Sequence, residues 1–362
     1  MVTKEKEHIH KSRALKAVIF VIAAALLFFY LNQVFGFSET DSNKRIFGAF
    51  YAQEENTVDV VYIGSSATNR YFIAPKAYNV EGMAAFDLAV MGFPLLFVPN
   101  VIDEVEKTQN PELYIIELRG VLKSKEDVTD AHIRRVTDSM KISANKYDAI
   151  DKALEYVDGA DSESGNIDEA LDYYIPVIKY HSRLVQGDMT AADLLPSGIP
   201  NFFKGFVVSP KTFKQVPQKE PVYSDGYGEL APEMEKVVND MLDKCDESDK
   251  EVLFVLAPYS MKEGEAEKFN TAVRMVTERG YTVLNMNTEE MVDEIGLDWE
   301  TDFYNSKHVN FIGAEKYTEF LTEYLAENYD LPDRRGDKAY ESWDEAYERY
   351  LMYLEKGPQD SN

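Results

Sequence analysis

The sequence contains very little cysteine and histidine, the two residue types that most often build compact metal sites. Cys245 is the only cysteine among 362 residues, so no disulfide can form within the chain. The five histidines show no metal-ligand spacing with it, so we expect neither a structural metal nor a cofactor. Two histidines lie within the first ten residues, which leaves three for acid–base chemistry elsewhere: His132, His181 and His308.

Basic residues are also few. The chain has 38 Lys and Arg against 64 Asp and Glu, a formal net charge of −26. A protein of this charge repels nucleic acid and anionic lipid, so we expect no nucleic-acid partner. An equally good interpretation is that the charge keeps the protein soluble beside an anionic cell envelope.

One long segment has no charged side chain at all. Residues 17–37 form an apolar run of 21 residues, which as a helix spans about 30 Å. This predicts a transmembrane helix. A cleaved signal peptide is the alternative, but its apolar region is usually about 7 to 15 residues long and no A-x-A-like site follows before Ser38.

The charges before this segment indicate its orientation. Residues 1–16 hold five basic and two acidic side chains, and the positive-inside rule keeps such a tail in the cytoplasm. We therefore expect a single-pass cell-membrane protein with residues after 37 outside the cytoplasm.

Strand and helix patterns alternate after a predicted stalk at residues 38–57. They predict an α/β domain over 58–330, a three-layer α/β/α arrangement around a parallel sheet. Between residues 123 and 230 the alternation fades into helical and loop patterns, an expected insertion. Residues 331–362 show a helical pattern with an aromatic stripe, typical of a tail that docks on the domain. The expected strands are 58–63, 84–90, 113–118, 251–257 and 281–284.

Two serines follow the first expected strand, in the sequence Gly64-Ser65-Ser66. A serine on such a turn lies at the carboxyl edge of a parallel sheet, where α/β enzymes place their chemistry. The N–H groups of a strand-to-helix turn can also bind an oxyanion. Ser66 is the better candidate nucleophile because the helix begins after it. The alternative is that both serines only form a turn or a helix cap.

His308 precedes the last helix of the expected domain and is the candidate base. A histidine in this role needs a partner that fixes its tautomer, usually a carboxylate on the same loop. Asp302 lies six residues before it and Asn305 three before it. A surface or capping histidine is the alternative.

Two further residues are expected at the same edge. Gly92 follows the second strand and could lend a backbone N–H to an oxyanion hole, or it is a plain turn residue. Arg119 ends the third strand beside Glu117. It could hold an anionic or carbonyl group, or it pairs with Glu117.

At these positions the chain resembles the SGNH (GDSL-like) hydrolase superfamily, which has a flavodoxin-like fold. The resemblance implies Ser66 as nucleophile, Gly92 as the glycine of the second conserved block and His308 as base. With its anchor, the chain is most similar to the branch that includes D-alanine transfer proteins and alginate acetylation factors. This implies a serine O-acyltransferase or esterase that modifies a cell-envelope polysaccharide, with a membrane-bound O-acyltransferase as partner.

The chain departs from the superfamily pattern in two places. Glu117-Leu118-Arg119 stands where the third block often has asparagine, and Asn305 replaces the aspartate of the D-x-x-H motif. An amide accepts a hydrogen bond from imidazole but does not stabilise imidazolium by charge. The site would then act as a Ser–His dyad, use Asp302 instead, or be inactive. The last case predicts an accessory or binding protein of an acylation system.

Overall fold

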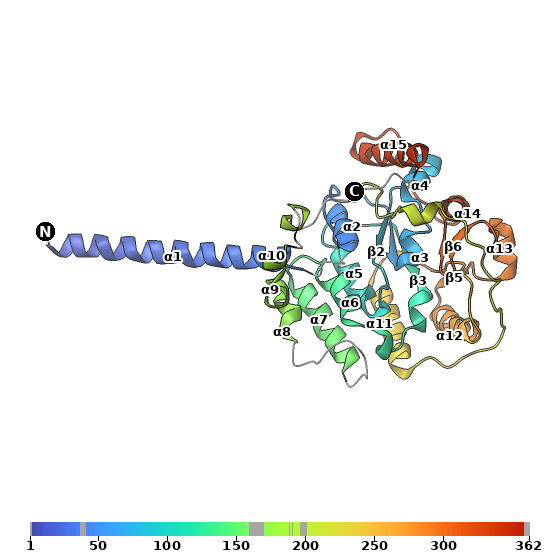
Figure 1. Ribbon diagram of the computed structural model, residues 1–362, viewed down its shortest axis with the longest axis horizontal. Coiled ribbons are helices and arrows are strands. Elements are labelled where there is room, and N and C mark those ends of the chain that lie inside the picture. Colours follow the sequence, from blue (N-terminus) through green and yellow to red (C-terminus); the bar gives the residue numbers. More distant parts are fainter. Residues whose placement is uncertain are drawn as a thin grey trace.

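The fold is built on a five-stranded parallel sheet with the strand order β2-β1-β3-β4-β5. The computed structural model describes residues 2–36, 41–158, 170–187, 189, 191–195 and 201–357 (Figure 1). The prediction of an α/β fold with a parallel sheet is confirmed, since every neighbouring pair runs parallel. The strands are β1 (Val60–Gly64), β2 (Ala85–Ala89), β3 (Leu113–Glu117), β4 (Glu251–Leu256) and β5 (Thr282–Asn285).

Strands β1, β2 and β3 are buried throughout, and each face of the sheet has its own apolar cluster. In β1, Val61 and Ile63 belong to one cluster and Val60 and Tyr62 to the other, as the two-residue period of a strand requires. The first cluster includes α5 (Val98–Val105), α11 (Pro232–Glu247) and α12 (Glu265–Glu278). The second includes α4 (Ala74–Glu81), α13 (Glu289–Ile295) and α14 (Phe311–Asn328).

The predicted insertion lies between β3 and β4 and is helical over much of its described length. Ile133 and Ile150, on its two longest helices, are buried in the first apolar cluster, so these helices share the core of the sheet. Its helices are α6 (Asp130–Thr137), α7 (Ala144–Val157), α8 (Leu171–Tyr174), α9 (Pro176–Tyr180) and α10 (Arg183–Gln186). Residues 159–169 of the predicted insertion lie outside the described residues.

Six short 3₁₀ segments join these elements in the described chain. They are η2 (Leu95–Phe97), η3 (Leu118–Leu122), η4 (Lys125–Asp127), η6 (Ala191–Leu194), η7 (Pro210–Phe213) and η8 (Lys338–Tyr340).

The N-terminal helix α1 (Val2–Val34) projects away from the rest of the chain (Figure 1). Its segment His10–Val34 is long and apolar enough to cross a membrane, although a signal sequence meets the same criterion. The helix ends at Val34, earlier than the predicted boundary at residue 37, and Phe35 is buried against the domain. Residue 37 lies outside the described residues.

The predicted stalk at 38–57 is largely part of the folded domain. Residues 38–40 lie outside the described residues, and the chain then forms α2 (Asp41–Tyr51). Ile46, Phe47 and Phe50 on this helix are buried, and the ring of Phe50 lies 5.4 Å from that of Phe86 on β2. The amphipathic spacing of these residues is the reason that the segment packs instead of extending.

The C-terminal helix α15 (Glu341–Lys356) lies against α4, beside the edge strand β2. Trp343 is 1% exposed, and its Nε1–H donates to the Ala85 carbonyl at 3.1 Å. The Lys204 ammonium lies 3.5 Å from the centre of its ring. Residues 358–362 of the predicted tail lie outside the described residues.

We expect Trp343→Ala to destabilise the protein by about 3–5 kcal/mol, because it removes a buried aromatic side chain and leaves a cavity. Urea unfolding of the full chain in detergent, followed by circular dichroism, measures the change. Met352 is the matched control on the same helix, since it is 47% exposed. A Trp343→Ala midpoint equal to that of Met352→Ala would show that α15 contributes nothing to stability.

Candidate functional site

The two serines after β1 have different structural roles. Ser65 is the N-cap of the short helix α3 (Ser66–Asn69), and its Oγ accepts from the Ala67 N–H at 3.2 Å. Ser66 is the first residue of that helix, so its side chain is not used for capping. At Gly64 a Cβ atom would lie 2.8 Å from Glu117 Cβ, which explains why a glycine begins this turn. Of the two, Ser66 is therefore available for chemistry.

His308 faces Ser66 directly, although 242 residues separate them. Its Nε2 lies 2.7 Å from Ser66 Oγ, a normal hydrogen-bond distance. His308 comes from a small antiparallel hairpin, β6 (Phe303–Asn305) and β7 (His308–Val309), in which Asn305 is paired with His308. The structure thus brings the predicted nucleophile and base together.

Asn305 lies on the other side of the imidazole. Its Oδ1 is 3.0 Å from His308 Nδ1 and also accepts from the Lys307 N–H at 2.9 Å. Because a backbone N–H donates to Oδ1, this atom is the acceptor and the proton must lie on His308 Nδ1. His308 Nε2 is then unprotonated and faces the Ser66 hydroxyl, the tautomer that a general base needs.

Asp302 is buried but bonded elsewhere. Its Oδ2 pairs with Lys316 Nζ at 2.7 Å and accepts from the Asp298 N–H at 2.9 Å, and its Oδ1 accepts from the Thr301 hydroxyl. The structure therefore places Asn305, and not Asp302, beside His308 Nδ1. Asp302 acts as an anchor for the start of the hairpin.

Arg119 lies in η3, directly after β3, and it holds the loop that carries His308. Its guanidinium donates to the Lys307 carbonyl at 2.8 Å and to the Ala257 carbonyl at 3.1 Å. It also lies over the Tyr259 ring at 4.3 Å, while its Nε is 3.9 Å from Glu117. These contacts assign it a positioning role, since its two terminal nitrogens donate to backbone carbonyls of the protein.

Gly92 lies at the same edge of the sheet as Ser66. The Val90 N–H donates to the Gly64 carbonyl at 3.1 Å, which joins the two turns. Gly92 has φ +68°, which other residues rarely adopt, and a Cβ here would lie 2.6 Å from the His132 ring. Both the backbone conformation and the close contact therefore require glycine. Within the described chain neither the Ser66 N–H nor the Gly92 N–H donates to a protein group. Both donors remain available for an oxyanion.

The electrostatic environment keeps His308 neutral. Burial, followed by the positive charges of Arg119, Arg70 and Lys307, lowers its pKa to about 3. The Tyr304 ring stacks on the imidazole with centroids 5.4 Å apart. At neutral pH the base is therefore in its unprotonated, active form, but its imidazolium lacks the anionic partner of a Ser–His–Asp triad.

Lys123 is a further cationic side chain near Gly92, and it was not identified from the sequence. Lys123 Nζ is 3.3 Å from His132 Nε2, and burial lowers the pKa of Lys123 to about 8, with Lys307 and Arg135 acting in the same direction. Burial and the charge of Lys123 lower the pKa of His132 to about 4. The surroundings of Ser66 are thus cationic in a chain of net charge −26.

Some residues near the site gave no signal in the sequence. Asp87, on β2 opposite Tyr62, is fully buried, and no described residue hydrogen-bonds its carboxylate oxygens. Burial raises its pKa well above the usual value for a carboxyl group. His181 lies apart from this site, in the insertion, where its Nδ1 donates to the Ile178 carbonyl at 2.8 Å.

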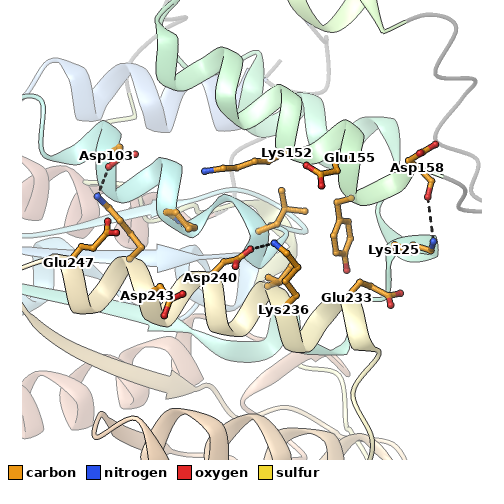
Figure 2. Close-up of a pocket in the computed structure, with 15 residues that line it drawn as sticks. Asp103, Lys125, Lys152, Glu155, Asp158, Glu233, Lys236, Asp240, Asp243 and Glu247 are labelled. Atoms are coloured by element: carbon orange, nitrogen blue, oxygen red, sulfur yellow. Dashed lines mark hydrogen bonds and ion pairs between the residues drawn. The ribbon is translucent and has the colours of Figure 1, made fainter.

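A large cavity lies elsewhere, between α5, α7 and α11 (Figure 2). It has a volume of about 740 Å³ and its lining is mostly charged, with ion pairs such as Lys236–Asp240 at 2.7 Å and Lys244–Asp103 at 2.5 Å. Neither Ser66 nor His308 lines it. This cavity is therefore separate from the Ser66 site.

Comparison with known proteins gives no relative: no protein-family model matches the chain, and no curated protein shows significant similarity to it. The functional argument therefore depends on the geometry of the site.

The pKa of His308 predicts an unusual pH dependence of Ser66 reactivity. The reactive form is the neutral imidazole, which is lost only as the pH falls toward about 3. We expect the rate of Ser66 labelling by a fluorophosphonate to stay level from about pH 8 to about pH 5, where an ordinary histidine of pKa about 6.5 would already be protonated.

Asn305→Asp should change this profile. A carboxylate beside Nδ1 favours the imidazolium, so it should raise the pKa of His308 by about 1 to 3 and move the loss of labelling to higher pH by the same amount. Asn305→Ala is the control, because it removes the acceptor without adding charge and should slow labelling without that upward movement. If labelling of Asn305→Asp and of the unaltered protein were lost at the same pH, the contact assigned between Asn305 and His308 Nδ1 would be contradicted.

Proposed function

We propose that the protein is a membrane-anchored serine O-acyltransferase or esterase of the SGNH type, with the three-layer α/β/α arrangement of that fold. Its ectodomain would lie outside the cytoplasm and modify a cell-envelope polysaccharide, with a membrane-bound O-acyltransferase as partner. The observation that carries the proposal is the 2.7 Å contact between Ser66 Oγ and His308 Nε2. The sheet edge, the free N–H groups and the apolar helix α1 support it.

The first half of the reaction transfers the acyl group to the protein. Ser66 Oγ attacks the carbonyl carbon of an acyl ester or thioester while its proton passes to His308 Nε2. The N–H groups of Ser66 and Gly92 donate to the oxyanion of the tetrahedral intermediate. The imidazolium then protonates the departing alcohol or thiol, and an acyl ester on Ser66 remains.

The second half returns the enzyme to its starting state. A hydroxyl of the acceptor, either a sugar or water, gives its proton to His308 Nε2 and attacks the acyl carbon. His308 returns the proton to Ser66 Oγ as the ester bond to the serine breaks. The two acceptors follow the same steps, so transferase and esterase activity differ only in which hydroxyl reaches the acyl-enzyme.

Having asparagine instead of aspartate at position 305 changes the energy of this cycle, but the orientation of the imidazole is kept. An asparagine can present the wrong group to the imidazole and trap the wrong tautomer, but the Lys307 N–H holds the Asn305 oxygen toward Nδ1. What is missing is only the negative charge that would stabilise the imidazolium. We therefore favour a working dyad with an oriented histidine.

The cations around the site favour an anionic substrate. Arg70, Lys123 and Lys307 lie close enough to lower the pKa of titratable neighbours, while the whole chain is acidic. Such local positive charge attracts a carboxylate- or phosphate-bearing polymer that the rest of the surface repels.

The second candidate is a catalytically impaired accessory or binding protein of an acylation system. One observation favours it: an amide stands at the position where a carboxylate would stabilise the imidazolium. It predicts that the fold is kept and that Ser66 does not react.

Serine labelling distinguishes the two functions. We expect a fluorophosphonate to label the full chain at Ser66, Ser66→Ala to abolish labelling, and His308→Ala to slow it by about 10²–10⁴-fold because proton transfer is lost. Hydrolysis of a short-chain p-nitrophenyl ester should follow the same order.

Ser65→Ala is the matched control. It removes the neighbouring hydroxyl and a helix cap, at a cost of about 1 kcal/mol in stability, but should leave the labelling site intact. Absence of an adduct in the folded protein would favour the accessory function. Undiminished ester hydrolysis by Ser66→Ala would exclude Ser66 as the nucleophile.

A further inference from the structure

The surface next to the end of α1 is unusually apolar. Large apolar side chains of the short elements α8, α9, α10 and η6 are exposed, and Val185 is 88% exposed. We call these four elements the collar. Its exposed apolar residues are Leu171, Ile178, Leu184, Val185 and Leu194. Several such residues gathered on one surface are typical of an interaction site, whereas single exposed apolar residues are ordinary.

The collar is bonded to the last turns of α1. The Tyr30 hydroxyl donates to the Leu194 carbonyl at 2.8 Å, and Arg183 donates to the Gly36 carbonyl at 3.0 Å. The Val177 N–H donates to Asn32 Oδ1 at 3.4 Å. Figure 1 shows α9 and α10 where α1 meets the domain. The apolar surface of the collar is therefore continuous with that of the membrane-spanning segment.

Both cationic side chains of the collar are paired with carboxylates. Arg183 pairs with Asp193 at 3.1 Å, and Lys179 with Asp130 of α6 at 3.1 Å. The positive charge of the collar is therefore neutralised beside its exposed apolar side chains.

An apolar groove lies between α1 and the insertion, beside the collar. Its volume is about 320 Å³, and Phe28, Phe29 and Asn32 of α1 line one side. Ile142, Tyr147, Tyr174 and Ile175 complete the lining. Tyrosines at the end of an apolar helix are typical of the boundary between bilayer and water. A groove with almost no polar lining suits an acyl chain.

We propose that the collar lies in the outer-leaflet boundary of the bilayer and that the groove holds an acyl chain of a membrane lipid. The inference rests on α1 crossing the membrane, but not on the acyl-transfer chemistry. It places the domain directly on the membrane surface.

The same contacts join the collar to the candidate site. Helix α6, which bonds Lys179 through Asp130, also contacts α8 through Arg134, whose guanidinium lies 4.0 Å from the centre of the Tyr173 ring. This helix carries His132, which packs on Gly92. A single helix, α6, therefore lies between the lipid-facing surface and the wall of the Ser66 site. A substrate attached to the membrane would thus have only a short distance to span to reach Ser66.

Fluorescence quenching in vesicles tests the proposal. The full chain is reconstituted in phosphatidylcholine vesicles with Val185→Cys carrying an environment-sensitive dye, and a mixture of lipids spin-labelled near the headgroup and in the middle of the acyl chain acts as quencher. The native Cys245 is buried and is not expected to react. Phe20→Cys on α1, 73% exposed in the structure, reports the membrane span, and Met352→Cys on α15, 47% exposed, reports the surface facing water.

We expect at least a twofold loss of fluorescence at positions 20 and 185, and little at position 352. Quenching at position 20 alone would overturn the proposal, and would indicate that a protein partner or a second copy covers the collar. Quenching at none of the positions would overturn it together with the membrane span. Equal quenching at 185 and 352 would also count against it, because it would show unspecific insertion.

Discussion

The candidate site depends on how the hairpin that carries His308 is held against the sheet, and the Arg119 guanidinium is central to this. Arg119 follows β3 and donates to the carbonyl of Ala257, just beyond β4, and to that of Lys307 in the hairpin. The Tyr71 hydroxyl donates to the same Lys307 carbonyl at 2.9 Å, and the Ser260 N–H donates to the Ser306 carbonyl at 3.0 Å. The hairpin is a separate pair of strands from the main sheet, so these bonds fix its position and help to set the distance between Ser66 and His308.

This way of holding the hairpin has an electrostatic consequence. The charge of Arg119, together with burial, lowers the pKa of His308, and Asn305 adds no negative charge in return. His308 is therefore neutral at ordinary pH values. Its imidazolium form, however, has no neighbouring carboxylate to stabilise it. A substrate with a negative charge near the reacting carbon would restore part of that stabilisation, which agrees with the cationic surroundings of Ser66.

The surface around the end of α1 differs from the rest of the molecule. The chain as a whole is acidic, while the segment His10–Val34 of α1 and the collar expose apolar side chains. In the membrane placement that we propose, this division of the surface would let the chain stand on a bilayer with its polar site above it. The edge strand β2 is buried: Trp343 of α15 donates to the Ala85 carbonyl and the Asp87 N–H donates to the Lys204 carbonyl, so these groups of its backbone are not offered to other chains.

The sequence by itself determined the elements that depend on local pattern. Runs of β-branched residues bounded by glycine placed the five strands to within a few residues, and their alternation with helices required a parallel sheet. It also selected Ser66 and His308 as candidates, because few histidines were available and strand ends converge at one edge, and the structure brings the two side chains together. It missed α2, since a short amphipathic segment after an apolar helix gave no sign of what it would pack against.

Only the tertiary structure decided between Asp302 and Asn305. The two differ by three positions in the chain, and which one meets His308 depends on the register of a two-residue hairpin pair and on Lys316, which binds Asp302 from another helix. The role of Arg119 and the contact of His132 with Gly92 were decided in the same way. Each of these contacts joins elements that are distant in sequence. The spacing of residues along the chain does not show which partner a long side chain will contact.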